Sequence, residues 1–259
     1  MTDALYVGAT GMRAHQTQVD TIANNVANVN TMGFRRESVS FSSVMAALQS
    51  GAIDPLGDSL RGNLVARGAG AIASLQLSTH GGELRKTDAP LDVAIDGSGF
   101  LEVTLPDGTP AYTRAGALTL DADGMLAGAG FPLSARIAVP SDASALQVTA
   151  DGRVLANLPD RSGVELGNIE LAAFANPGGL ESAGGNLFRA TAASGDMRLG
   201  TPGEAGVGTL RQGYLEASNV QLVDELVSLM LAQRGFEMNS KIVQAADQML
   251  GITNSLYGG

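Results

Sequence analysis

The proline-free segment from residue 218 to 257 constrains the fold of this chain more than any other stretch. Its apolar residues form two neighbouring stripes at the period of an α-helix. One stripe contains Leu222, Leu226, Leu229, Phe236, Val243 and Leu250. The other contains Leu231, Met238, Ile242, Ala245, Met249, Ile252 and Leu256. Such a helix spans about 55 Å, and because it is apolar on more than one side we expect it to need partner helices. Ser218 or Asn219 is its expected N-terminal cap.

A second long helix is expected at the other end of the chain, where residues 3–29 contain no proline. Its apolar stripe has the spacing of a coiled-coil seam and consists of Leu5, Ala9, Met12, Val19, Ile22, Val26 and Val29. Two interpretations remain open on periodicity alone. The terminal helices pair in a bundle, or they are the first and last helices of an ordinary α+β domain and pack on its sheet.

Four asparagines, Asn24, Asn25, Asn28 and Asn30, mark the end of the first helix, and Gly33 is suited to the left-handed turn that stops it. These amides have two interpretations. They belong to a frayed, solvated helix end, or they fix the register against neighbouring helices, as polar residues at seam positions do.

The middle of the chain has strand and turn signals instead of helical ones. Asp-Gly pairs at 96–97, 107–108, 123–124 and 151–152 lie between apolar runs and predict hairpins. Strands are expected at 91–95, 100–105, 117–120, 145–149, 153–155 and 169–174. Before them, Pro55 and several glycines exclude a helix and indicate an extended segment, with a short strand at 75–77.

We predict an α+β fold with two long terminal helices, an extended connector and a central all-β domain of short strands. Of the two arrangements above, we take the coiled-coil-like bundle of the terminal helices as the prediction. The expected parts are an N-terminal helix at 1–34, an extended connector at 35–90, the β domain at 91–192, a return connector at 193–217 and a C-terminal helix at 218–259.

Composition and charge argue against several classes of function. The chain has no cysteine, which excludes disulfides and thiolate metal sites. Its net charge is −10, and residues 91–195 hold twelve acidic against five basic residues, so no basic patch is available for nucleic acid. No apolar run is long enough for a transmembrane helix, and no cleavable signal peptide is visible.

Reactive side chains do not converge in the sequence. His15, on the polar side of the first helix, and His80 are isolated. The segment from Asp121 to Gly124 resembles part of a calcium loop but lacks the closing glutamate, and is better explained as a hairpin turn. Gly97-Ser98-Gly99 lacks the third glycine of a dinucleotide site. We expect no catalytic residue, no cofactor and no metal; a calcium-dependent or carbohydrate-active enzyme is the contrasting hypothesis, and it predicts a monomer with a pocket.

Several segments resemble the bacterial flagellar rod and hook protein family, most closely its distal rod branch. They are IANNVANVNTMGF at 22–34, LDVAIDGSGF at 91–100, QGYLEASNV at 212–220 and QRGFEMNSK at 233–241. Gly235-Phe236 stands where the family usually has Ala-Tyr, and Val26 where it has Leu. Residues 45–65 match the distal rod pattern poorly.

The resemblance implies a structural subunit of the distal rod that self-assembles into a hollow drive shaft and transmits torque from motor to hook. A proximal rod or hook component is the alternative. Implied partners are further copies of the chain, proximal rod proteins, hook proteins and surrounding ring proteins, with no nucleic acid and no membrane insertion. The implied location is the basal body, from periplasm to outer membrane, reached by type III export without a cleavable signal peptide.

The residues expected to carry self-assembly combine the two stripes with the signature positions. They are Leu5, Met12, Val19, Ile22, Asn24, Asn25, Val26, Asn28, Asn30, Gly33, Phe34, Leu222, Leu226, Leu229, Phe236, Asn239, Ile242, Val243, Met249 and Leu250.

Overall fold

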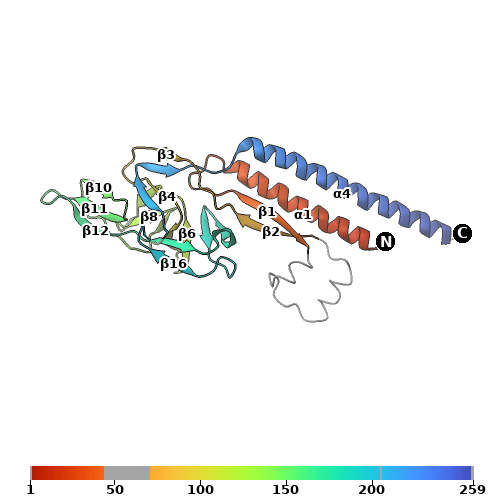
Figure 1. Cartoon of the computed structure of the whole chain (residues 1–259), viewed down its shortest axis with the longest axis horizontal. Helices are drawn as coiled ribbons and strands as arrows, with labels where there is room; N and C mark the ends of the chain where they lie inside the picture. Colours follow the sequence, from red (N-terminus) through yellow and green to blue (C-terminus); the bar gives the residue numbers. More distant parts are fainter. Residues whose placement is uncertain (1, 44–70, 205, 258–259) are drawn as a thin grey trace. The chain divides into compact units, whose positions relative to one another are not determined.

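The computed structural model describes residues 2–43, 71–204 and 206–257 (Figure 1). Two α-helices and many short antiparallel strands make up this part of the chain, which confirms the α+β prediction. The chain divides into two compact units. The helix unit holds both helices and a strand pair, and the β unit holds residues 28–36 and 77–220. Pro55 and residues 45–65 lie outside the described residues.

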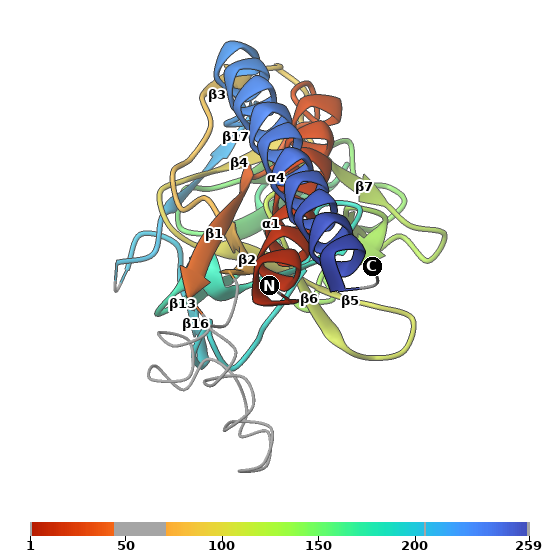
Figure 2. The same ribbon diagram turned by 90° about the vertical axis from the view of Figure 1, so that its right-hand side faces the viewer.

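The helix unit consists of α1 (Thr2–Ala27), β1 (Glu37–Ser43), β2 (Ala71–Leu77, of which the last residue belongs to the β unit) and α4 (Leu222–Tyr257). The helices lie side by side, and β1 pairs with β2 (Figure 2). They run antiparallel, because Gly8 near the start of α1 lies against Val243, and Asn25 near its end binds Glu225.

The helix ends differ slightly from expectation. Helix α4 begins at Leu222, so neither Ser218 nor Asn219 holds the capping position, and that prediction is wrong. The carboxamide of Asn219 instead accepts a hydrogen bond from the Arg36 backbone N–H and donates one to the His80 carbonyl. Asp224 and Glu225 do lie in the first turn, where acidic side chains favour the positive end of the helix dipole.

The β unit is built from short strands in several small sheets. Its largest sheet has six strands in the order β14-β15-β6-β5-β13-β16. These strands are β14 (Glu181–Gly184), β15 (Leu187–Arg189), β6 (Pro110–Thr113), β5 (Phe100–Thr104), β13 (Leu171–Phe174) and β16 (Met197–Gly200). A 3-10 turn, η1 (Pro177–Gly179), precedes β14.

Two three-stranded and two two-stranded sheets complete this unit. The three-stranded sheets are β7 (Leu118–Leu120), β8 (Leu126–Gly128) and β9 (Phe131–Pro132), and β10 (Ala145–Val148), β11 (Arg153–Asn157) and β12 (Val164–Asn168). The two-stranded sheets pair β4 (Val93–Asp96) with β17 (Thr209–Gln212), and β3 (Leu84–Lys86) with β18 (Tyr214–Glu216). All six strands expected in the middle of the chain are present, with small differences at their ends.

Three of the four predicted Asp-Gly hairpins are confirmed. The pairs at 107–108, 123–124 and 151–152 each join strands that pair with one another, and each glycine has positive φ. The hairpin at Asp96-Gly97 is wrong, since β4 pairs with β17, which is far away in sequence. Gly97 and Gly99 have positive φ, and they turn the chain out of one sheet and into another.

Alternation along the strands gives the six-stranded sheet two apolar faces. Leu101 and Val103 of β5 belong to the main core, whereas Phe100 belongs to a second, smaller cluster that also contains Phe188 and Tyr112. Successive residues of a strand point to opposite faces, so both faces are covered and the sheet forms the centre of the unit.

Candidate assembly interface

The face of α4 that packs on α1 is made of small and polar residues. Glu225, Ala232 and Ala246 are at most 3% exposed, and with Asn239 they follow one another at intervals of seven residues. Close approach of the helices explains the small side chains. A Cβ added at Gly11 would lie 2.7 Å from the Asn239 amide nitrogen, and one added at Gly235 would lie 2.6 Å from the His15 ring. We call Gly8, Gly11, Ala232, Gly235 and Ala246 the small-residue seam.

Many large apolar side chains of α4 lie outside this seam, although Val243 packs against Gly8. Leu231 is 63% exposed and Met238 is 65% exposed. We define the outer stripe as Val223, Val227, Met230, Leu231, Met238 and Ile242, all of which are exposed. A row of exposed large apolar residues along one helix is typical of an interaction surface, because removing each side chain from water on binding is favourable in free energy.

A buried polar junction joins three elements of the helix unit at Asn25. The side-chain NH2 group of Asn25 donates to the Glu37 carbonyl at 2.8 Å, and its carbonyl oxygen accepts from the Glu37 N–H at 3.0 Å. The same NH2 group donates to Oε2 of Glu225 at 3.3 Å. Asn25 is 1% exposed and Glu225 is fully buried. The junction therefore connects α1, the first residue of β1 and the first turn of α4.

The β unit holds a buried charge cluster of Glu216 between two arginines. One carboxylate oxygen lies 2.8 Å from Nη2 of Arg35, and the other lies 3.2 Å from Nη1 of Arg114. All three side chains are at most 5% exposed. Arg35 also donates to the carbonyls of Thr79 and His80.

Arg114 is the second anchor of this cluster. It donates to the backbone carbonyls of Ile95 and Gly97, and its guanidinium lies 5.2 Å from the centre of the Phe100 ring. Burial lowers the pKa of Arg114 to about 10, with Glu216 opposing the shift, so the guanidinium stays charged at neutral pH. The cluster fixes two segments within the β unit. One is the segment at Arg35, which follows α1, and the other is the segment at Glu216, which precedes α4.

Comparison with known proteins gives three matching sequence families. The one described as "Flagella basal body rod protein" matches residues 5–35, "Flagellar hook protein FlgE/F/G D1 domain" matches 94–156, and "Flagellar basal body rod FlgEFG protein C-terminal" matches 211–256. The flagellar basal-body rod protein FlgG of Borreliella burgdorferi is 41% identical over 99% of both chains. FlgG of Caulobacter vibrioides is 41% identical over 98% of both chains. The chain belongs to the flagellar basal-body rod protein family. The predicted family and a structural role in the rod, most like FlgG, are thereby confirmed.

The structure distributes the expected assembly residues of the rod protein over several environments. In and after α1, the buried ones are Ile22, Asn25, Gly33 and Phe34, the partly buried ones are Met12, Val19, Val26 and Asn28, and the exposed ones are Asn24 and Asn30. In α4, the partly buried ones are Leu229, Asn239 and Val243, and the exposed ones are Leu222, Leu226, Phe236, Ile242 and Met249. The side chains of Leu5 and Leu250 lie outside the described residues.

Reasoning from the sequence missed the polar members of these sites. Glu225, Glu37, Arg35, Arg114 and Glu216 were not expected to be functional, although Glu216 lies inside the signature segment QGYLEASNV. The heptad spacing of Glu225, Ala232, Asn239 and Ala246 was a signal that could have been found. His15, expected to be a solvated or interface histidine on the polar side of its helix, lies with its ring against Gly235 of α4.

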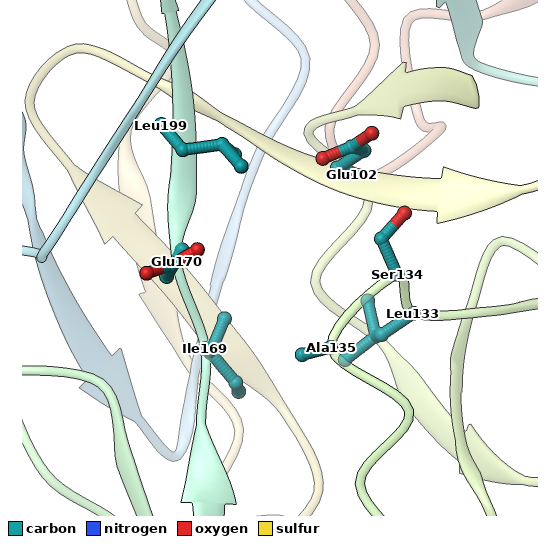
Figure 3. A pocket seen from close by; sticks show the side chains of 7 residues that line it. All are labelled: Glu102, Leu133, Ser134, Ala135, Ile169, Glu170 and Leu199. Carbon is teal, nitrogen blue, oxygen red and sulfur yellow. The ribbon is translucent and has the colours of Figure 1, made fainter.

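A small hollow in the β unit has a volume of about 110 Å³ and carries two carboxylates, Glu102 and Glu170 (Figure 3). Figure 3 shows Ser134 beside Glu102, and Ile169 next to Glu170. Leu199, from the neighbouring strand β16, also lines the hollow. Burial raises the pKa of Glu102; Glu170 adds to the shift and a hydrogen bond with Ser134 opposes it.

Across the described ranges, no three acidic or histidine side chains are grouped as a metal site would require, and no helix is long and apolar enough to cross a membrane.

Proposed function

We propose that this rod protein self-assembles into a hollow shaft through the outer stripe of α4, with helices of other copies as the occupants of that surface. The observation that supports this proposal is which residues the helix unit buries and which it exposes. Its seam uses mainly small and polar residues, while most of the large apolar side chains in the described part of α4 are exposed. Covering one such side chain contributes about 1.5–3 kcal/mol, and many copies stacked around an axis would cover the whole stripe.

The proposed position is the distal rod, between the proximal rod proteins and the hook, within the surrounding ring proteins. This follows the FlgG relatives, which match along almost their full length. The proposed role is mechanical: the shaft transmits torque and encloses the channel for exported subunits, and the chain has no catalytic activity of its own. We propose that it reaches the zone from periplasm to outer membrane by type III export without a cleavable signal peptide.

The role of a proximal rod or hook component remains the second candidate, because the family matched at 94–156 also includes hook proteins. Locating the labelled chain in purified basal bodies distinguishes the two positions. A label next to the hook, on the rod side, supports the distal rod, whereas a label near the motor or within the hook contradicts it.

A charge on the outer stripe tests self-assembly directly. Leu231→Asp replaces a side chain that is 63% exposed in the single chain with a carboxylate, so the helix unit should still fold. In an assembled shaft the same carboxylate would be buried away from water without a partner, which is strongly unfavourable. We expect loss of rods in electron micrographs of basal bodies and loss of swimming.

The matched control is Gln233→Asp, which adds the same charge at an exposed polar position two residues away. It should assemble and swim as the parent chain does. Normal rods in the Leu231→Asp strain would show that the outer stripe is not the assembly surface.

A further inference from the structure

We propose that Asn25 is a positioning residue that sets the register of α1, β1 and α4. This inference rests on the proposed function in one respect, since the register decides how the outer stripe is presented to other copies. It adds a specific residue and a mechanism to that function. The polar partners are Glu37 and Glu225, neither of which belongs to an apolar stripe.

The carboxamide of Asn25 binds Glu37 as a neighbouring strand would. It accepts from the Glu37 N–H and donates to the Glu37 carbonyl, so both backbone groups of the first residue of β1 are satisfied by one side chain. A carboxamide has both an acceptor and donors, whereas a carboxylate at this position would have no donor. Aspartate is therefore a poor replacement despite its nearly identical shape.

The third partner, Glu225, makes the junction specific for α4. Its carboxylate is fully buried and accepts a hydrogen bond from Asn25, which lies 200 residues earlier in the sequence. A buried carboxylate is strongly unfavourable unless it is hydrogen-bonded. Any shift of α4 along α1 moves Glu225 away from Asn25, so the junction favours one register over the others.

The junction acts together with the small-residue seam. A Cβ added at Gly8, Gly11 or Gly235 would lie within 2.7 Å of Val243, Asn239 or His15, so each of these glycines faces a side chain of the other helix at close range. The buried polar junction adds a directional contact, which a shifted helix would leave unsatisfied. A polar residue at a seam position is the best-attested way of fixing register in paired helices.

Engineered disulfides report the register directly, because the chain has no cysteine of its own. A Cβ at Gly8 would lie 4.0 Å from the Cβ of Val243, within the range that a disulfide spans. The pair Gly8→Cys with Val243→Cys therefore reports the native register. The pair Gly8→Cys with Asp247→Cys reports a slip by one helical turn, and it carries Val243→Ala so that the new Cβ does not meet the Val243 Cγ2 methyl group at 2.6 Å.

The test measures the yield of both cross-links in the full-length chain under mild oxidation. In the parent background we expect the 8–243 cross-link and little of the 8–247 one. Asn25→Asp should lower the 8–243 yield about tenfold, as expected for losing a buried hydrogen bond, and raise the 8–247 yield. Adding Glu225→Gln, which removes the facing charge and restores a donor, should recover most of the 8–243 yield. The control Asn30→Asp, at an exposed asparagine, should change neither cross-link.

Each other outcome overturns the inference. An unchanged 8–243 yield in Asn25→Asp shows that Asn25 does not set the register. If Asn25→Asp abolishes both cross-links and adding Glu225→Gln does not restore them, Asn25 only stabilises the fold. Absence of the 8–243 cross-link in the parent background shows that the helices do not pair in this way. Failure of the proposed function is distinguishable, because a chain that makes the native cross-link but forms no rods contradicts only the assembly.

Discussion

The helix unit and the β unit put opposite kinds of residue in their interiors. In the β unit, Leu101, Val103 and Leu171 are completely buried. In the helix unit, the most buried of the described side chains of α4 are Glu225, Ala232 and Ala246, while Leu231 and Met238 are mostly exposed. The β unit has thus already buried its large apolar side chains, whereas the helix unit keeps many of its own for another surface.

Both units also contain buried polar groups, and these lie where distant segments meet. Glu216 joins segments around residues 35 and 114, and Asn25 joins elements whose sequences are up to 200 residues apart. Buried polar contacts give directional specificity that apolar contacts lack, since misplacing one leaves an unsatisfied group. The comparison suggests a division between apolar burial, which supplies stability, and polar junctions, which select the arrangement.

The largest expected effect lies in the β unit. Glu216→Ala removes the carboxylate between two buried guanidiniums and should lower the free energy of unfolding of this unit by about 3–5 kcal/mol. Urea denaturation monitored on the full-length chain measures the loss. The control Arg153→Ala breaks an exposed ion pair with Asp151, leaves the Asp151-Gly152 turn intact and should leave the transition unchanged. Equal effects of the two substitutions would mean that burial of the cluster is not what makes it important.

A smaller effect is expected from filling the small-residue seam. Ala232 is 1% exposed, so Ala232→Leu has no room and should force the helices apart, at about 1–3 kcal/mol. Hydrogen exchange of the α1 amides measures the loss of protection. Ala245→Leu makes the same change at an exposed position of α4 and should leave protection unchanged. If both variants exchange alike, the seam is not tightly packed and the contrast between the units is weaker than described.

The smallest effect concerns pH and the hollow of the β unit. Burial raises the pKa of Glu102 above its ordinary value of 4.5, so the folded chain holds this proton more tightly than the unfolded chain does. Stability from this group is therefore full below the unfolded pKa and declines as pH rises through the folded pKa. Glu102→Gln should remove part of that decline, measured as urea midpoints between about pH 4 and 7.

The exposed Glu181 provides the control for this measurement. Glu181→Gln should leave the pH dependence of the midpoint as it is in the parent chain. A pH profile that is identical in the parent and in Glu102→Gln would show that Glu102 is not desolvated in the folded β unit.

Features that depend on neighbouring residues were predictable from the sequence. The two helices follow from three-to-four spacing without proline, and the hairpins at 107–108, 123–124 and 151–152 follow from Asp-Gly pairs between strands. Family signatures at both ends indicated a flagellar rod protein, and the relatives confirm it.

Features that depend on distant partners were decided only by the tertiary structure. The Asp96-Gly97 pair carries the same local signal as the others, yet β4 takes a partner more than one hundred residues away, which no local pattern encodes. Periodicity showed that α4 is apolar on several sides but not which side α1 covers. That side proved to be the one with glycine and alanine, because small residues permit close helix approach while giving almost no hydrophobic signal in a sequence.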